Sequence, residues 1–253
     1  GTRENSQSII IPKGCTLAFR IIQIHIRDGA WDLGHIPKKV KVIRSLQADS
    51  GKKILEKVEK EFQNHCQIFS KLSSDLLLII LNTIKAVMRD NNLLQELSQK
   101  MEEVAEQNDG YELKTQSPDL QALFSSLQHS PRDRLLQLAE GITYVLDALH
   151  ELMEDQLLLL LESLERKIVS QQLKLVEILL THGLDKGQES FLVDARLLSF
   201  PHKEEQKLTI ALVEMSGVQL QEDGSALPRD QPFEDVAALF VALYALNLLS
   251  ASK

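Results

Sequence analysis

Cysteine, glycine, proline and aromatic residues are all scarce in this chain. Its 253 residues include two cysteines, seven prolines and eleven glycines, and aromatic side chains make up only 5%. Two cysteines cannot form a disulfide framework, and no CxxC or HExxH motif is present, so a disulfide-stapled or zinc-binding fold is excluded. Few prolines and glycines suit long helices, because both residues disfavour helix interiors. We expect a reducing, cytosolic setting.

Long apolar runs are also missing, although 43% of the residues are hydrophobic and can build a core. No uninterrupted apolar run approaches the ~20 residues that a membrane-spanning helix needs. The first residues do not show the basic-then-apolar order of a secretory signal. We therefore expect this part of the protein to be soluble.

Motifs for catalysis or for metal or phosphate binding are absent as well. The seven histidines never stand at ligand spacing from one another or from a cysteine. His65 and Cys66 are adjacent, but neighbours on a helix point about 100° apart and do not face each other. One exposed and one core position is the simpler interpretation of that pair. The sequence therefore predicts no cofactor, no metal and no enzymatic activity.

Charge is distributed unevenly along the chain, whose net charge is −8. Residues 1–50 carry eight Lys and Arg against four Asp and Glu, whereas residues 51–253 carry 20 against 32. The net basic residues 1–50 and the net acidic residues 51–253 attract each other, which suggests an interface between the two segments. An ordinary solvated surface is an equally good interpretation of the acidic part. The net negative charge of residues 51–253 argues against nucleic acid as a partner.

The chain begins with a strand-like stretch, SIIIPKGCTLAFRIIQIHI, at residues 8–26. Apolar and polar side chains alternate with period two from Leu17 onward, and Ile22, Ile24 and Ile26 share one side. Pro12–Gly14 has the composition of a turn. A two-stranded hairpin is marginal alone in water, and the chain offers few further strands for a sheet. Residues 1–33 are therefore predicted to be the end of a β-rich domain.

A linker is expected at residues 34–51, because this segment has no sustained hydrophobic period and contains Pro37 and Asp49-Ser50-Gly51. The domain boundary is predicted to lie within it. The segment also contains a basic linker patch, formed by Lys38, Lys39, Lys41 and Arg44.

Helical periodicity dominates after Gly51, and the fold class is predicted to be mainly α. Residues Asp75–Met88 are almost entirely apolar, which predicts a helix buried on most of its circumference. Ser117-Pro118 and Ser130-Pro131 each open a helix, because proline is favoured at the first helical position. Other helices are expected at Ile54–His65, Leu93–Val104, Leu157–Leu161, Gln171–Leu180 and Val236–Leu249.

One part of this region, residues 190–221, has an ambiguous pattern. Leu208–Val213 fits a helix or a short strand, and Val218–Gln221 favours a strand. The expected architecture is a multi-helix bundle with a short β element, preceded by a β-hairpin remnant.

Two segments of the strand-like stretch carry a family resemblance. Ile11-Pro12-Lys13-Gly14 and Leu17-Ala18-Phe19-Arg20 closely resemble the IPxGxxLAFR segment in the last hairpin of the gasdermin pore-forming domain. Residues 87–90, 142–149 and 242–249 resemble the C-terminal domain of the same family. The resemblance covers essentially the whole chain. The chain resembles a C-terminal fragment of a gasdermin that lacks the N-terminal part of the pore-forming domain.

The resemblance implies a function and a domain order. Residues 1–33 would be the last strands of the pore-forming domain, 34–51 the linker, and 52–253 a helical autoinhibitory domain. In the family the β-rich half inserts into membranes with acidic lipids and forms a homo-oligomeric pore only after activation. The helical half masks it until a protease cuts the linker, and lytic cell death (pyroptosis) follows. The inactive protein would be cytoplasmic, and the released half would act at the plasma membrane.

The resemblance thus implies two protein partners, the pore-forming half of the same protein and an activating protease, with caspases among the candidates. Cutting the linker makes the inhibitory contact bimolecular, so the effective concentration of the inhibitor falls. A helical scaffold or adaptor without any pore role is the alternative function. Binding to the pore-forming half and suppression of liposome leakage distinguish the two.

Four residues are candidates for the inhibitory interface. Tyr144 and Ala148 fall where the family pattern has a Tyr-x-x-x-Ala that contacts the pore-forming half, and their i,i+4 spacing places them on one helix face. Both also fit ordinary core positions. In the first helix, Ile54 or Leu55 matches an apolar contact of the family. Ala148→Asp is expected to weaken inhibition and to leave the helical domain folded.

Asp49 is the candidate cleavage residue. Caspases cut after aspartate in extended, exposed segments and favour a small residue next, and Asp49-Ser50-Gly51 supplies both. Asp49 also fits a helix cap, since a helix is expected to begin near Lys52. Proteases that prefer Lys38, Lys39 or Arg44 are further candidates for the same linker.

Overall fold

The chain divides into two compact units, residues 1–36 and 37–253, in a computed structural model. The division falls inside residues 34–51, and the role of that segment as an interdomain linker stays a prediction. The structure describes residues 24–27, 30–33, 51–107, 112–182, 190–228 and 233–251.

The first unit contains a β-hairpin, formed by β1 (Ile24–Arg27) and β2 (Ala30–Leu33). The strands pair antiparallel, with Ile26 opposite Trp31. In the same register Ile24 is opposite Leu33. The predicted strand character is confirmed at residues 24–27, while residues 8–23 lie outside the described part of the chain.

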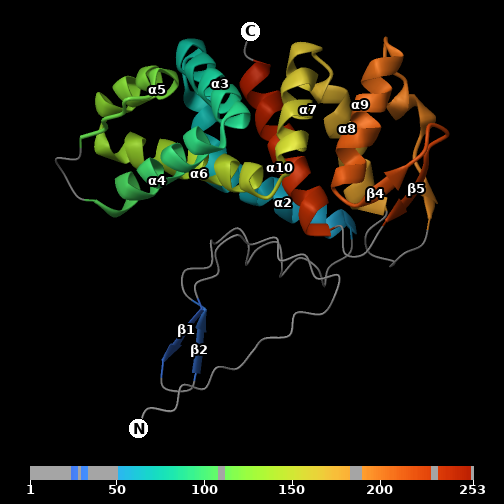
Figure 1. The fold of residues 1–253 in the computed structure, drawn as a ribbon, viewed down its shortest axis with the longest axis horizontal. Coiled ribbons are helices and arrows are strands. Elements are labelled where there is room, and N and C mark those ends of the chain that lie inside the picture. The colour runs from blue at the N-terminus through green and yellow to red at the C-terminus, as the bar shows by residue number, and fades with distance from the viewer. Residues whose placement is uncertain are drawn as a thin grey trace. The chain divides into compact units, whose positions relative to one another are not determined.

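The second unit, called the helical unit below, confirms the mainly α prediction (Figure 1). Its α-helices are α2 (Gly51–Cys66), α3 (Ser74–Arg89), α4 (Asn91–Glu106), α5 (Pro118–Gln128), α6 (Arg132–His150), α7 (Glu154–Glu165), α8 (Val169–His182), α9 (Lys203–Met215) and α10 (Phe233–Ser250). Two 3-10 helices, η1 (Gln67–Lys71) and η2 (Ala195–Leu198), follow α2 and precede α9.

The last helix, α10, is the central helix of this unit. It runs between α3 and α7 in Figure 1 and packs against α8, α6 and α3. Every residue from Val236 to Leu243 is buried. A helix that is apolar on all sides requires such a position, because any exposed face would leave apolar surface in water. None of the described helices is long and apolar enough to cross a membrane.

The buried helix expected at residues 75–88 is α3. Most of its apolar side chains are buried, but Leu78 is 44% exposed, so one side of the helix faces water. The Ser73 hydroxyl caps its start by accepting a hydrogen bond from the Leu76 amide at 3.3 Å. Asp90 separates α3 from α4, and its carboxylate accepts a hydrogen bond from the Asn92 amide at 2.9 Å.

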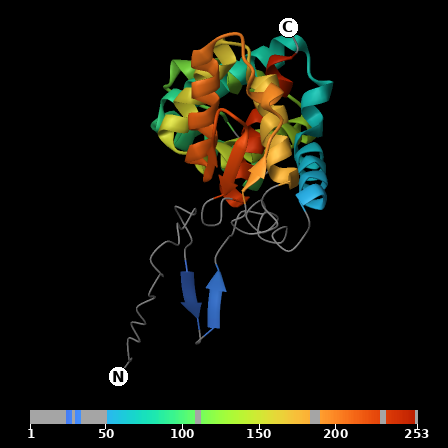
Figure 2. The same cartoon turned by 90° about the vertical axis from the view of Figure 1, so that its right-hand side faces the viewer.

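The ambiguous region 190–221 contains a helix and a small sheet. Leu208–Val213 belongs to α9, and the strand expected near residue 218 is β4 (Val218–Leu220). Two further strands, β3 (Phe191–Leu192) and β5 (Ser225–Pro228), complete an antiparallel sheet with the order β3-β5-β4. Figure 2 looks onto this end of the unit, where α9 packs against β4.

Gly224 makes the tight turn between β4 and β5, where its φ of +93° is in the left-handed region. A Cβ atom at this position would lie 2.3 Å from the Val193 carbonyl oxygen. We expect Gly224→Ala to lower the free energy of unfolding by about 1–3 kcal/mol, measured by denaturant unfolding. Gly217→Ala is the matched control, because Gly217 also has a positive φ of 96°. Equal losses in the two variants would show that the contact with Val193 adds nothing.

Candidate interaction face around Tyr144

An aromatic cluster joins α2, α6 and α10. Phe62 and His65 stand three residues apart on α2 and therefore share one helix face. The His65 ring stacks on the Tyr144 ring, with centroids 4.7 Å apart and an interplanar angle of 12°. Phe62 meets Tyr144 edge-on at 5.9 Å and lies 4.5 Å from the ring of Tyr244 on α10. The cluster fixes the position of Tyr144 between two neighbouring helices.

His65 also connects carboxylates on two helices. Its Nε2 lies 3.0 Å from Glu61 Oε2, one turn earlier on α2, and its Nδ1 lies 2.8 Å from Glu140 Oε1 on α6. Only a doubly protonated imidazole donates to both oxygens at once, since the neutral ring has one N–H. The side chain is 19% exposed, so these contacts sit at the edge of the core rather than within it.

Further acidic groups surround Tyr144. Burial raises the pKa of its phenol, and the charges of Cys66, Glu61, Asp147 and Glu151 raise it further. A raised phenol pKa means that the hydroxyl stays protonated at neutral pH. We call Glu61, Glu140, Asp147 and Glu151 the acidic ring. The acidic ring lies beside the aromatic cluster, whose Phe62 and Tyr144 side chains are only 2% and 7% exposed.

Cys66 and Gly141 lie where α2 and α6 approach each other closely. The Cys66 thiol is buried and lies 3.7 Å from the Gly141 carbonyl oxygen. Burial raises the pKa of this thiol, and the charge of Glu140 adds to the effect. A Cβ at Gly141 would lie 3.1 Å from the Phe69 ring, so glycine permits the contact. Cys66 thus takes the core position expected of the pair, whereas His65 is half-buried.

The structure places the predicted interface residues in or near the core of the helical unit. Tyr144 is 7% exposed and Ala148 0% exposed on α6, and Leu55 is 8% exposed on α2, which packs against α6. The side chain of Ile54 lies outside the described residues, as do Asp49 and the basic linker patch. The roles assigned to all of these residues stay predictions.

The acidic ring itself was not predicted, although part of it has a sequence signal. Glu140, Tyr144 and Glu151 fall at i, i+4 and i+11, which is one face of a helix, and Asp147 continues the same face. Glu61 joins them only because α2 packs on α6. A search for acids at helical spacing around Tyr144 would have found the α6 members.

A separate acidic contact lies between α2 and α8. Desolvation raises the pKa of Glu59, and the nearby charges of Glu177 and Glu56 raise it further. Because the pKa is higher in the folded state, ionisation of Glu59 costs stability as the pH rises, and the cost is absent in acid.

We expect Glu59→Gln to raise the free energy of unfolding by about 0.2–0.5 kcal/mol at pH 7, the size of a relieved like-charge pair. The gain should vanish at a pH low enough to protonate Glu59 in both states. Denaturant unfolding of both proteins at each pH measures it. A gain that persists in acid would point to a packing effect instead of charge.

Comparison with known proteins gives a family match. The family model of the Gasdermin PUB domain matches residues 54–227. Mouse gasdermin-A3 is 31% identical over an alignment 284 positions long, which covers 99% of this chain and 57% of the relative. Human gasdermin-A is 31% identical over an alignment 269 positions long, which covers 98% of this chain and 57% of the relative. The chain thus spans little more than half the length of these relatives.

Proposed function

The chain belongs to the gasdermin family, and from this premise we propose that its helical part, residues 52–253, binds the pore-forming half of a gasdermin and keeps it inactive. Gasdermins are not enzymes, so the function to be explained is binding. The scaffold or adaptor role remains the alternative, since the same helices would serve it.

The acidic ring around Tyr144 is the observation that supports this proposal best. A pore-forming domain must hide apolar surface and basic, lipid-seeking surface while it is inactive. The Glu140 carboxylate is 56% exposed and complements basic surface of that kind, whereas the Phe62 and Tyr144 rings beside it are buried within the helical unit. The charge of the chain supports the same pairing, since residues 1–50 are net basic and residues 51–253 net acidic. Acidic membrane lipids would compete for the same basic surface after release.

Cleavage of the linker is the proposed switch. While the chain is intact, the inhibitory contact is intramolecular and its effective concentration is high, on the order of millimolar for a short flexible connection. After cleavage the two parts separate by dilution. The pore-forming half would then move from the cytoplasm to the plasma membrane, oligomerise and cause lytic cell death.

A liposome leakage assay tests the inhibitory function. The pore-forming half of the protein is mixed with vesicles that contain acidic phospholipid, with and without an excess of the 253-residue chain. We expect the chain to bind the pore-forming half and to suppress dye release. Neither binding nor suppression would favour the adaptor role.

A protease panel tests the switch residue. The linked protein is incubated with caspases and with proteases that cut after basic residues, and the new N-terminus is sequenced. A fragment that begins at Ser50, and that is lost in Asp49→Ala, would support Asp49 as the cleavage residue. Cleavage after Lys38, Lys39 or Arg44 would assign the switch to a different protease class.

A further inference from the structure

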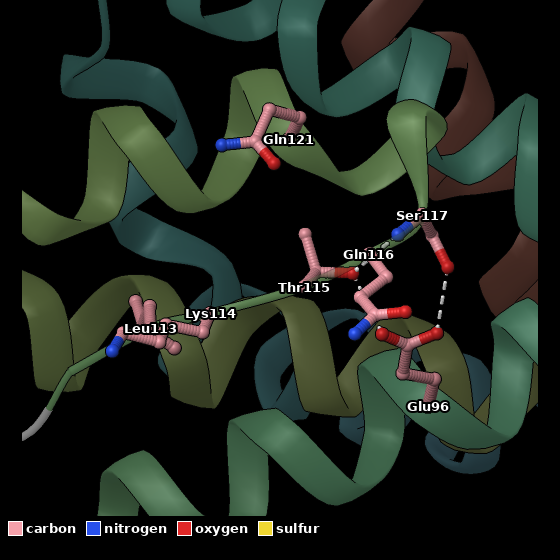
Figure 3. Close-up of a pocket in the computed structure, with 7 residues that line it drawn as sticks. All are labelled: Glu96, Leu113, Lys114, Thr115, Gln116, Ser117 and Gln121. Atoms are coloured by element: carbon pink, nitrogen blue, oxygen red, sulfur yellow. Dashed lines mark hydrogen bonds between the residues drawn. The ribbon is translucent and has the colours of Figure 1, made fainter.

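Two hydroxyl groups share one carboxylate at the surface of the helical unit. Thr115 donates a hydrogen bond to Glu96 Oε1 at 2.7 Å, and Ser117 donates one to Oε2 at 2.9 Å. Figure 3 shows Ser117 and Glu96 facing each other beside a pocket of about 590 Å³. Residues 112–117 form neither helix nor strand. The two hydrogen bonds therefore tie an irregular segment to α4.

Ser117 and the residues before it have the non-helical backbone that protein kinases bind in their substrates, whereas Pro118 begins α5. The Ser117 φ of −87° and ψ of 115° are extended, as expected before a proline. Gln116 and Pro118 are exposed on either side of it. Proline-directed kinases require proline directly after the acceptor residue, and Pro118 meets this requirement. We propose that Ser117 is a phosphorylation site for a proline-directed serine/threonine kinase.

The reaction is an ordinary phosphoryl transfer from ATP. The Ser117 Oγ attacks the γ-phosphorus, and an Oγ–P bond forms while the bond from the γ-phosphorus to the β,γ-bridging oxygen breaks. ADP leaves with that oxygen, and the catalytic base of the kinase takes the hydroxyl proton. The hydrogen bond to Glu96 and the first turn of α5 must open first, which requires local unfolding at the start of this helix.

The second Ser-Pro pair of the described chain, Ser130-Pro131, provides an internal comparison. Ser130 lies in the short connection between α5 and α6 and is flanked by helices on both sides, whereas Ser117 has a helix on one side only. Its amide donates to the Leu127 carbonyl and its hydroxyl to the Ser126 carbonyl. Phosphorylation there would require unwinding the end of α5, where Leu127 is fully buried. We expect kinases to spare Ser130 in the folded protein.

Phosphorylation would break the contact with Glu96. A phosphoserine carries about −1.5 to −2 charges at pH 7 and no longer donates a hydrogen bond. It would sit where the Ser117 hydroxyl now contacts the Glu96 carboxylate, so the two anions repel each other. Ser117 is also the N-cap of α5, and a helix N-terminus favours negative charge. The phosphate would therefore stay at α5, and Glu96 with α4 would lose its hold on residues 112–117.

The test uses the full chain, MgATP and purified mitogen-activated and cyclin-dependent kinases, with phosphosite mapping by mass spectrometry. We expect one phosphate on Ser117 in the native sequence and in Ser130→Ala, and none in Ser117→Ala. A synthetic peptide of residues 112–121 serves as the accessible reference substrate. The proposal is overturned if the folded chain is labelled at Ser130 instead, or if Ser117 is not labelled, whether or not the peptide is.

Hydrogen exchange tests the structural consequence separately. The amides of Leu113 and Ser117 donate to Gln128 Oε1 at 2.6 Å and to Thr115 Oγ1 at 3.0 Å. Phosphorylation should speed exchange at both amides by about tenfold, because it removes charge-assisted hydrogen bonds that hold the segment. In Glu96→Gln, which has no charge to repel the phosphate, phosphorylation should change exchange much less. Equal exchange before and after phosphorylation would refute the loss of the Glu96 contact.

Discussion

Replacing Ala148 by aspartate is expected to lower the free energy of unfolding of the helical unit by about 3–5 kcal/mol, the usual cost of a buried charge without a partner. Ala148 is 0% exposed, and its neighbours Val145 and Leu149 are equally buried. A carboxylate there must either stay charged in an apolar environment or bind a proton. Since the free energy of unfolding of a native protein is only about 5–15 kcal/mol, this substitution would remove a large share of it.

Thermal and urea unfolding of Ala148→Asp measure this effect. Gln137→Asp is the matched control, because Gln137 is exposed on the same helix and should lose no more than about 0.5 kcal/mol. If Ala148→Asp melted like the native protein, the position would not be buried in solution. The sequence pattern predicts instead a folded variant with weakened inhibition, so unfolding must be measured before any leakage assay is interpreted.

The helices of the helical unit were predictable because their apolar residues repeat at helical spacing. α3 and α10 have the most apolar sequences and were located within a few residues. β3 and β5 were not predicted, since β3 has two residues and β5 contains Ala226 and Pro228, which disfavour strands. Their pairing depends on Gly224 and on the position of α9. No local pattern contains that information.

The candidate interaction face was only partly predictable for a similar reason. Tyr144 and Ala148 came from a family pattern along a single helix. The contacts that define the surroundings of Tyr144 join residues far apart in sequence, such as Phe62 with Tyr244 and His65 with Glu140. Helical periodicity predicts which face of each helix is apolar, but not which helix it meets. The packing of the whole unit determines which helix lies against each apolar face, and only the structure shows this.

Glu140→Lys is expected to weaken binding of the pore-forming half by about tenfold, or ~1.4 kcal/mol, if the acidic ring contacts basic surface as proposed. The Glu140 side chain is 56% exposed, so the helical unit should lose no more than about 1 kcal/mol of stability with the His65 contact. Binding is measured by titration at several salt concentrations. The variant should show a weaker salt dependence, because fewer opposite charges meet across the interface.

Glu165→Lys separates this local effect from a change of net charge. Glu165 is exposed at the end of α7, a helix that packs against α3 and α9. Both variants change the net charge by +2, so an attraction that depends only on total charge would weaken equally in both. A specific interface predicts that Glu140→Lys suppresses leakage less well than the native chain, while Glu165→Lys suppresses it normally. Equal affinity and equal salt dependence in the two variants would remove Glu140 from the interface.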